Sequence, residues 1–159
     1  MHRKFGGTMK STLRKVLSIA VFSVTQAGFA FGQQPANMTE ARIKAVGGRQ
    51  MKGAELKSMI VGNTVYFIAL TQVGPLRPGT VGPVWHPDER RRFLGTGNGN
   101  KVEALWWVDG DSYCNERKIS GPGHSCNMVW ESNGSLYFCP AQGDCIYSAR
   151  IVPGNPEKL

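Results

Sequence analysis

Turn signals interrupt the second half of the chain so often that only short strands fit between them. Asp109-Gly110 and Asn133-Gly134 are dipeptides that favour tight hairpins between antiparallel strands. The segments around them are rich in β-branched and aromatic residues, which favour strands. We predict strands at 64–70, 90–94, 102–108, 112–115, 127–131, 136–139 and 146–152, with a turn at 95–100. The predicted fold class is mainly β (α+β), a small antiparallel meander that forms a barrel or a curved sheet.

One short amphipathic helix precedes these strands. Leu56, Met59 and Ile60 recur at helical spacing among polar residues in 51–61, and we expect this helix to pack on one opening or edge of the sheet. The remaining segments are predicted to be a flexible leader at 33–50 with room for one helical turn, a glycine- and proline-rich loop at 71–83 and a frayed tail at 153–159. A single disulfide-bonded β-rich domain at 51–152 is expected between leader and tail.

The N-terminus has the pattern of a secretory signal peptide. Basic residues precede a largely apolar run at 16–31, whose uninterrupted part is shorter than the roughly 20 residues that span a bilayer. We assign 1–32 to the signal peptide, with cleavage after Gly32; cleavage after Ala30 is the second candidate, and Met9 is an alternative start. We therefore expect a periplasmic or secreted protein without a stable transmembrane anchor. An uncleaved amphipathic anchor is the alternative.

The net charge of +8 belongs mostly to this N-terminal segment. Residues 1–32 hold five basic side chains and no acidic one, so the 19 basic residues of the chain fall to 14 in the remainder, against 11 acidic residues. That excess is too small and too scattered to mark a phosphate-binding surface, and we expect no nucleic-acid partner. Removing 32 of the 159 residues leaves 127, enough to fold as a monomer without a metal or cofactor.

Four cysteines, Cys114, Cys126, Cys139 and Cys145, lie in the last third of the chain. An even number in an exported chain favours two disulfides, and sequence alone allows three connectivities. We predict Cys114 with Cys126, which bracket a polar loop, and Cys139 with Cys145, which flank PAQGD at the neck of a hairpin. Zinc held by cysteines and His124 is the alternative, although no CxxC or HxxxH spacing is present.

Three segments together resemble a known family: LKSMIVGNTV at 56–65, WWVDGDSYC at 106–114 and CNMVWESNGSLYF at 126–138. Their order resembles that of a family of small exported proteobacterial proteins classed as a domain of unknown function. The resemblance covers 54–152, and the chain departs from it in the pair Cys139 and Cys145 and in the loop at 74–83. It implies an envelope location and a β-rich fold, and it brings no catalytic residues.

The sequence contains no complete catalytic motif. His86 and His124 are the histidines that remain after residue 32, and both lie in segments bounded by glycine or proline, where we expect exposure. GHSCN at 123–127 lacks the final glycine of a nucleophile elbow. GTGNGN at 95–100 lacks the Lys-Ser/Thr pair of a phosphate-binding loop. We therefore expect a protein that is not an enzyme.

Two features are candidates for a binding surface. Arg90, Arg91 and Arg92 form the densest charge cluster after residue 32, and guanidinium groups fork onto carboxylates and phosphates; a solvated turn is the alternative. The other feature is the set of large aromatic residues, of which we favour Trp107 for a binding surface; the alternative is that the helix covers Trp107. The set comprises Trp85, Trp106, Trp107, Trp130, Tyr113 and Tyr137. In the hairpin around Asp109-Gly110 we pair Trp106 with Tyr113 and Trp107 with Ser112, so alternation sends Trp106 to the core and Trp107 outward.

Two functional hypotheses follow. The first is a noncatalytic binding module of the cell envelope, which presents aromatic and arginine side chains to an unidentified ligand or protein. The second is a proteinaceous inhibitor of an extracytoplasmic enzyme, for example a cell-wall hydrolase, in which the loop 115–125 protrudes between Cys114 and Cys126. An enzyme is the third, and it requires His86 or His124 to meet acidic residues in a pocket.

Overall fold

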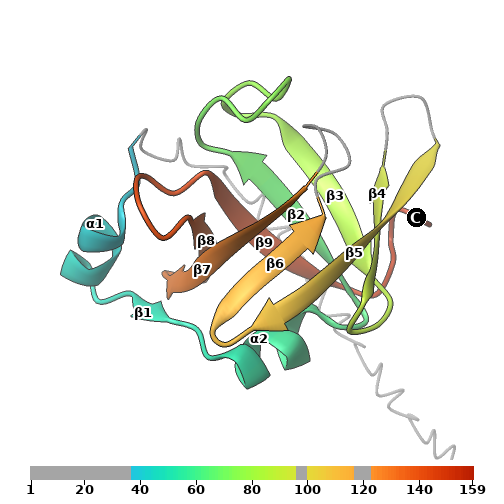
Figure 1. The fold of residues 1–159 in the computed structure, drawn as a ribbon, viewed down its shortest axis with the longest axis horizontal. Coiled ribbons are helices and arrows are strands. Elements are labelled where there is room, and N and C mark those ends of the chain that lie inside the picture. Colours follow the sequence, from blue (N-terminus) through green and yellow to red (C-terminus); the bar gives the residue numbers. More distant parts are fainter. Residues whose placement is uncertain (1–36, 96–99, 117–122) are drawn as a thin grey trace, which may run out of the picture. The chain divides into compact units, whose positions relative to one another are not determined.

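The computed structural model describes residues 37–95, 100–116 and 123–159, in which eight strands form a closed antiparallel barrel (Figure 1). The strands are β2 (Asn63–Ala69), β3 (Val81–His86), β4 (Arg91–Gly95), β5 (Lys101–Asp109), β6 (Ser112–Glu116), β7 (His124–Ser132), β8 (Ser135–Cys139) and β9 (Tyr147–Pro153). Each strand pairs with the next along the chain, and β9 pairs with β2 to close the ring. A further strand, β1 (Arg49–Gln50), pairs with β7. The predicted mainly β meander is confirmed, in its barrel form.

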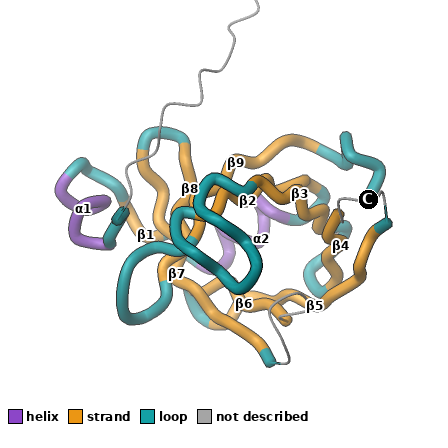
Figure 2. The backbone as a smooth tube through the Cα atoms, turned by 90° about the horizontal axis from the view of Figure 1, so that it is seen from above, coloured by secondary structure: helices purple, strands orange, loops and turns teal. Residues whose placement is uncertain are grey.

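The helix α2 (Gly53–Ile60) lies within the ring of strands when the barrel is viewed from above (Figure 2). Its Leu56 and Ile60 are fully buried and join the side chains of the barrel interior. A Cβ on Gly53 would lie 2.2 Å from the Gly110 carbonyl oxygen, so only glycine allows the helix to begin so close to the β5–β6 hairpin. From that hairpin, the Asp111 carboxylate accepts a hydrogen bond from the Gly53 backbone N–H at 2.9 Å, as an N-cap side chain would. The predicted helix is therefore present.

The structure differs from the prediction of a flexible leader at 33–50. A helix, α1 (Glu40–Ala45), precedes β1, and its Ile43 is completely buried against Trp130 and Tyr137. These two aromatic residues form a cross-strand pair between β7 and β8, outside the barrel core, so α1 covers an apolar outer surface. A helix of six residues contains too few apolar positions to reveal such a partner by periodicity. Among the described residues no helix is long and apolar enough to span a membrane.

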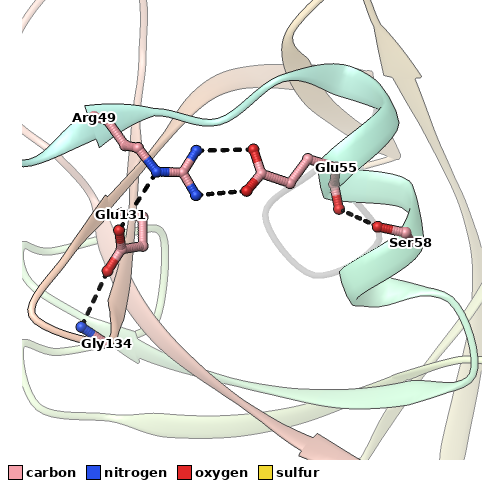
Figure 3. Close-up of polar contacts among 5 residues, drawn as sticks. All are labelled: Arg49, Glu55, Ser58, Glu131 and Gly134. Carbon is pink, nitrogen blue, oxygen red and sulfur yellow. Dashed lines mark hydrogen bonds and ion pairs between the residues drawn. The ribbon is translucent and has the colours of Figure 1, made fainter.

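A surface ion-pair network joins β1 to α2 and to the β7–β8 turn (Figure 3). The Arg49 guanidinium donates to both carboxylate oxygens of Glu55, at 2.8 and 2.5 Å, and its Nε lies 3.8 Å from Glu131. Glu131 accepts from the backbone N–H of Gly134 at 3.1 Å, and the Ser58 hydroxyl donates to the Glu55 carbonyl at 2.9 Å. Because exposed ion pairs contribute little free energy, this network orients the N-terminal elements more than it stabilises them.

The sequence prediction missed β3 and placed its first residues in the loop 71–83. Val81–His86 form a full partner to β2, with Pro83 opposite Tyr66. On its other side β3 pairs with β4 only at Val84 and Trp85 in the described ladder. Pro83 therefore lies beyond the β3–β4 pairing, where its missing N–H costs no ladder hydrogen bond. Proline and glycine at the start of the strand suppressed the sequence signal.

The tail 153–159, predicted to be frayed, folds back on the barrel. The Asn155 side chain accepts from the Leu159 backbone N–H at 2.9 Å and donates to the Leu159 carbonyl at 2.7 Å. Leu159 packs over Gly95 of β4, where its Cδ2 lies 3.2 Å from the position that a Cβ would take. This contact joins residues far apart in the sequence, so the composition of the tail alone could not indicate it.

Aromatic rings fill the middle of the barrel. Trp106 is 1% exposed and stacks on Tyr113, with 5.5 Å between the ring centroids. Tyr113 meets Phe138 edge to face at 5.3 Å, and the Trp106 indole N–H donates to the Asp88 carbonyl at 2.8 Å. The predicted core position of Trp106 is confirmed, and its one polar group is satisfied.

Both predicted disulfides are confirmed. Cys114–Cys126 joins directly paired positions of β6 and β7, and Cys139–Cys145 links the end of β8 to the residues before β9. In the chain-entropy description each bridge stabilises the fold by about 2–3 kcal/mol, and the longer loop contributes more. Because the described residues contain no free cysteine, the zinc alternative with His124 has no thiolate ligands.

Candidate binding surface

The three arginines predicted to form one exposed cluster do not face the same way. Arg90 and Arg91 are exposed, whereas Arg92 is only 6% exposed and points into the barrel. Arg92 lies opposite the buried Ala104 in the β4–β5 ladder, so the alternation of β4 sends its side chain inward. The prediction was wrong for Arg92 because three consecutive charges conceal the alternation of a strand.

Arg90 and Arg91 line an open concavity of about 550 Å³. The other lining residues are Asp88, Glu89, Glu103 and Leu105. Asp88 shapes this site: its carboxylate accepts from the backbone N–H of Arg91 and Arg90 at 2.7 and 2.8 Å and from Arg91 Nε at 2.6 Å. These donors hold the pKa of Asp88 below its usual value. The concavity therefore carries fixed charges of both signs beside an apolar side chain.

Trp107 faces outward, as predicted, but in a different cross-strand register. Asp109 pairs with Ser112, so the turn residues are Gly110 and Asp111, and Trp107 lies opposite Cys114 rather than Ser112. Trp106 likewise lies opposite Asn115 rather than Tyr113. The predicted register was wrong because it placed Gly110 second in the turn. With a φ of +57°, Gly110 takes the first turn position, as a type II′ turn requires. The shift of two residues leaves the face of each tryptophan unchanged.

The outward side chains of three adjacent strands form one surface, which we call the β3–β5 face. Its members are Trp85 on β3, Arg91 and Phe93 on β4, and Glu103, Leu105 and Trp107 on β5. Cross-strand pairs connect them: Trp85 stacks on Phe93 at 5.6 Å, and Arg91 lies opposite Leu105. Leu105 is 42% exposed at the centre, and Trp107 lies half-buried with its ring 5.9 Å from His124.

Neither helix packs on the β3–β5 face. α1 packs on β7 and α2 on the inner ends of β2, β5 and β6; Figure 2 shows α1 on the side of the barrel away from β4 and β5. Sequence reasoning included Trp85 among its aromatic candidates but missed Phe93 and Leu105 as surface residues. The available signal was that apolar residues occupy both odd and even positions of 102–108. Since successive side chains of a strand point to opposite faces, either the odd or the even set had to face outward.

The two histidines lie in different environments. His86, expected at the surface, is completely buried as the last residue of β3, with its Nε2 3.0 Å from the Tyr113 hydroxyl. Burial, and secondly the charge of Arg92, lower the pKa of His86 to about 3, so its ring is neutral at pH 7. His124 is exposed on β7 beside Trp107. Within the described part of the chain neither histidine forms an ion pair with a carboxylate.

The structure bears on three further features considered from the sequence: a metal site, the loop 115–125 and the turn at 95–100. Residues 37–95, 100–116 and 123–159 contain no group of three His, Cys, Asp or Glu side chains placed to hold a metal ion. The loop 115–125, expected to protrude in an inhibitor, is only partly described, since 117–122 lie outside the described residues. The turn predicted at 95–100 likewise falls mostly outside them.

Comparison with known proteins finds no match: no protein-family model, no curated protein and no solved structure is similar to this chain. The resemblance of 54–152 to an exported family therefore stays a prediction. Function has to be inferred from the surface and the interior of the barrel themselves.

Proposed function

We propose that this protein is an exported, noncatalytic binding domain of the cell envelope, which uses the β3–β5 face to hold a protein partner. The observation that carries the proposal is the composition of that face. The exposed Leu105 lies across from Arg91 and two residues before Trp107 on β5, while Phe93 and the Trp85 stacked on it continue the same outer face onto β4 and β3. Aromatic and arginine side chains around an apolar centre are the residues enriched at protein interfaces.

The charges at the concavity favour a protein over an anionic lipid surface or an acidic polysaccharide. Three carboxylates, of Asp88, Glu89 and Glu103, accompany the two guanidinium groups of Arg90 and Arg91. Arg91 is already paired with Asp88 at 2.6 Å, and Glu89 with Lys57 at 3.1 Å. Such a surface does not attract a polyanion at long range, whereas a partner with complementary charges of both signs can match it.

The scaffold also suits binding. The Cys114–Cys126 disulfide lies beside Trp107 on the outer face of the sheet, because Cys114 is the cross-strand partner of Trp107. A closed barrel with this covalent bridge holds the β3–β5 face in one geometry, which reduces the conformational entropy lost on association. The alternative function, an inhibitor of an extracytoplasmic enzyme, rests on the loop 115–125. Because 117–122 are not described, no observation favours it over the β3–β5 face.

A photo-crosslinking amino acid in place of Leu105 tests the proposed surface in intact exporting cells. We expect a discrete adduct with one protein, because this position is the exposed centre of the face. Adding Arg91→Glu should lower the adduct yield about tenfold, since it reverses a charge beside the contact. The matched control carries the crosslinker at Val46, which is 62% exposed at the C-cap of α1, and α1 lies on the side of the barrel away from β4 and β5 (Figure 2). Equal yields from both positions, or a yield insensitive to Arg91→Glu, contradict the proposal.

Export is tested separately, by the intact mass of protein secreted with its own N-terminus and purified without reductant. The two disulfides are compatible with an oxidising compartment, and the compact unit that contains the barrel spans Gln33–Leu159. We expect a mass for Gln33–Leu159 lower by four hydrogens. Cleavage after Ala30 would add Phe31 and Gly32 to that mass. An unprocessed chain with free thiols contradicts the envelope location.

A further inference from the structure

The interior of the barrel contains a positive charge that has no negative partner among residues 37–95, 100–116 and 123–159. Arg92 is buried, with its Nη2 donating to Asn115 Oδ1 at 2.9 Å and to the Glu116 carbonyl at 2.5 Å. Its Nη1 lies 3.4 Å from the Tyr113 hydroxyl. All three acceptors are neutral oxygens. Nε, which is equally buried, has no acceptor among the described residues.

No carboxylate of this chain neutralises Arg92. Within the described residues no Asp or Glu oxygen lies within 4.0 Å of its guanidinium. The segments outside the described part, 1–36, 96–99 and 117–122, contain neither Asp nor Glu. The missing negative charge must therefore come from outside the chain or remain absent.

An uncompensated guanidinium in the core is energetically costly. Arginine does not lose its proton in proteins, so it cannot become neutral as a buried lysine or histidine does. The penalty for an unpaired buried charge is large, and hydrogen bonds to neutral oxygens offset only part of it. The fold nevertheless accommodates this side chain. Opposite Arg92 stands Ala104, whose small side chain leaves room for the arginine to reach from β4 past β5 to Asn115 on β6.

The groups around Arg92 hold it in place. The Tyr113 hydroxyl lies between His86 and Arg92: it is 3.0 Å from His86 Nε2, and Arg92 Nη1 donates to it at 3.4 Å. Burial raises the pKa of Tyr147 on β9, and the Arg92 charge partly opposes that rise, so this phenol lies within electrostatic reach of the guanidinium. The Tyr147 ring packs against Phe67 beside the barrel core, with 5.6 Å between the ring centroids.

We propose that Arg92 anchors a binding site for a small carboxylate inside the barrel, with its buried Nε, which has no acceptor among the described residues, as the donor. A carboxylate is favoured over phosphate because one guanidinium neutralises one negative charge, and a dianion would leave a net charge in an aromatic interior. The apolar remainder of such a ligand would meet the rings that line the barrel. This site is distinct from the β3–β5 face and does not depend on the function proposed for that face.

The site is tested on the full mature chain, dialysed free of small anions, by thermal unfolding with acetate or benzoate. Sodium chloride at equal ionic strength is the reference. We expect each carboxylate to raise Tm by about 3 °C or more at saturating concentration, because a ligand that binds only the folded state stabilises it. Arg91→Met, which removes the exposed neighbouring arginine, should retain the shift. Arg92→Met, which keeps the length of the side chain without its charge, should lose it.

A second measurement keeps the proposal testable if Arg92→Met does not fold. In the wild-type protein, the NMR signal of the Arg92 Nε–H should shift in a saturable manner with acetate and remain unchanged with chloride. Inorganic phosphate should shift it at least tenfold more weakly. An unaffected Nε–H signal, a Tm shift that Arg92→Met retains, or phosphate binding as tight as that of acetate each overturns the proposal.

Discussion

Replacing Trp106 with alanine is expected to lower the free energy of unfolding by about 3–5 kcal/mol. The side chain is 1% exposed, stacks on Tyr113 at 5.5 Å and meets His86 edge to face at 5.0 Å. The substitution also leaves the Asp88 carbonyl without the indole N–H that now donates to it at 2.8 Å. Urea denaturation at neutral pH, followed by far-UV circular dichroism, measures the loss.

Trp107→Ala is the matched control, since the two tryptophans are adjacent in the sequence and point to opposite faces of β5. Trp107 is half-buried on the outside, so its removal leaves a surface depression rather than an internal cavity. We expect a loss below about 1.5 kcal/mol. Equal losses for the two variants, or a larger one for Trp107→Ala, would show that Trp106 is not the core tryptophan.

The free energy of unfolding is expected to fall as the pH decreases from 6.5 towards 3, because of His86. Burial lowers the pKa of this histidine to about 3 in the folded protein, whereas the unfolded chain has the ordinary value of 6.5. Between pH 6.5 and pH 3 the His86 ring binds a proton in the unfolded state but not in the folded state. The contribution of His86 is thus fully present above pH 6.5 and is lost progressively below it, by at most about 1.4 kcal/mol per pH unit.

Urea denaturation at several pH values between 6.5 and 5 isolates this effect. Asp88, Asp111 and Glu55 have lowered pKa values and lose their own contributions only at more acidic pH. We expect a decrease of about 2 kcal/mol over the window. His86→Gln should abolish most of the slope, whereas His124→Gln, at an exposed position, should leave it intact. A slope that survives His86→Gln, or one that disappears with His124→Gln, would refute the assignment to His86.

Local sequence patterns were sufficient to predict much of the fold. The Asp-Gly and Asn-Gly signals, with the short apolar segments around them, predicted the antiparallel meander, and helical spacing predicted α2. The disulfide connectivity also followed from short sequence separations, which are 12 and 6 residues in the structure. These features depend on contacts between residues that are close in the sequence, so the sequence is sufficient to predict them. For the same reason the inward direction of Trp106 followed from simple alternation within one strand.

Contacts between residues far apart in the sequence determined the features of the fold that the sequence alone did not predict. Ile43 is buried because β7 and β8 present Trp130 and Tyr137 to it, and the polar context of 33–50 does not reveal them. The tail is ordered because Leu159 meets Gly95. The burial of His86 depends on Tyr113, and closure of the ring depends on β9 returning to β2.

The candidate sites show the same division. Sequence by itself determined that tryptophans and arginines would cluster around 90–107, and that the fold would be a bridged β meander. Only the tertiary structure decided that Arg91 faces outward, opposite Leu105 on β5, whereas Arg92 faces inward, opposite Ala104 on β5. The physical reason is that successive side chains of a strand point to opposite faces. A shift of one residue in the pairing therefore moves a side chain from the solvent face to the core face. That register is set by pairing with β3 and β5, not by the three arginines themselves.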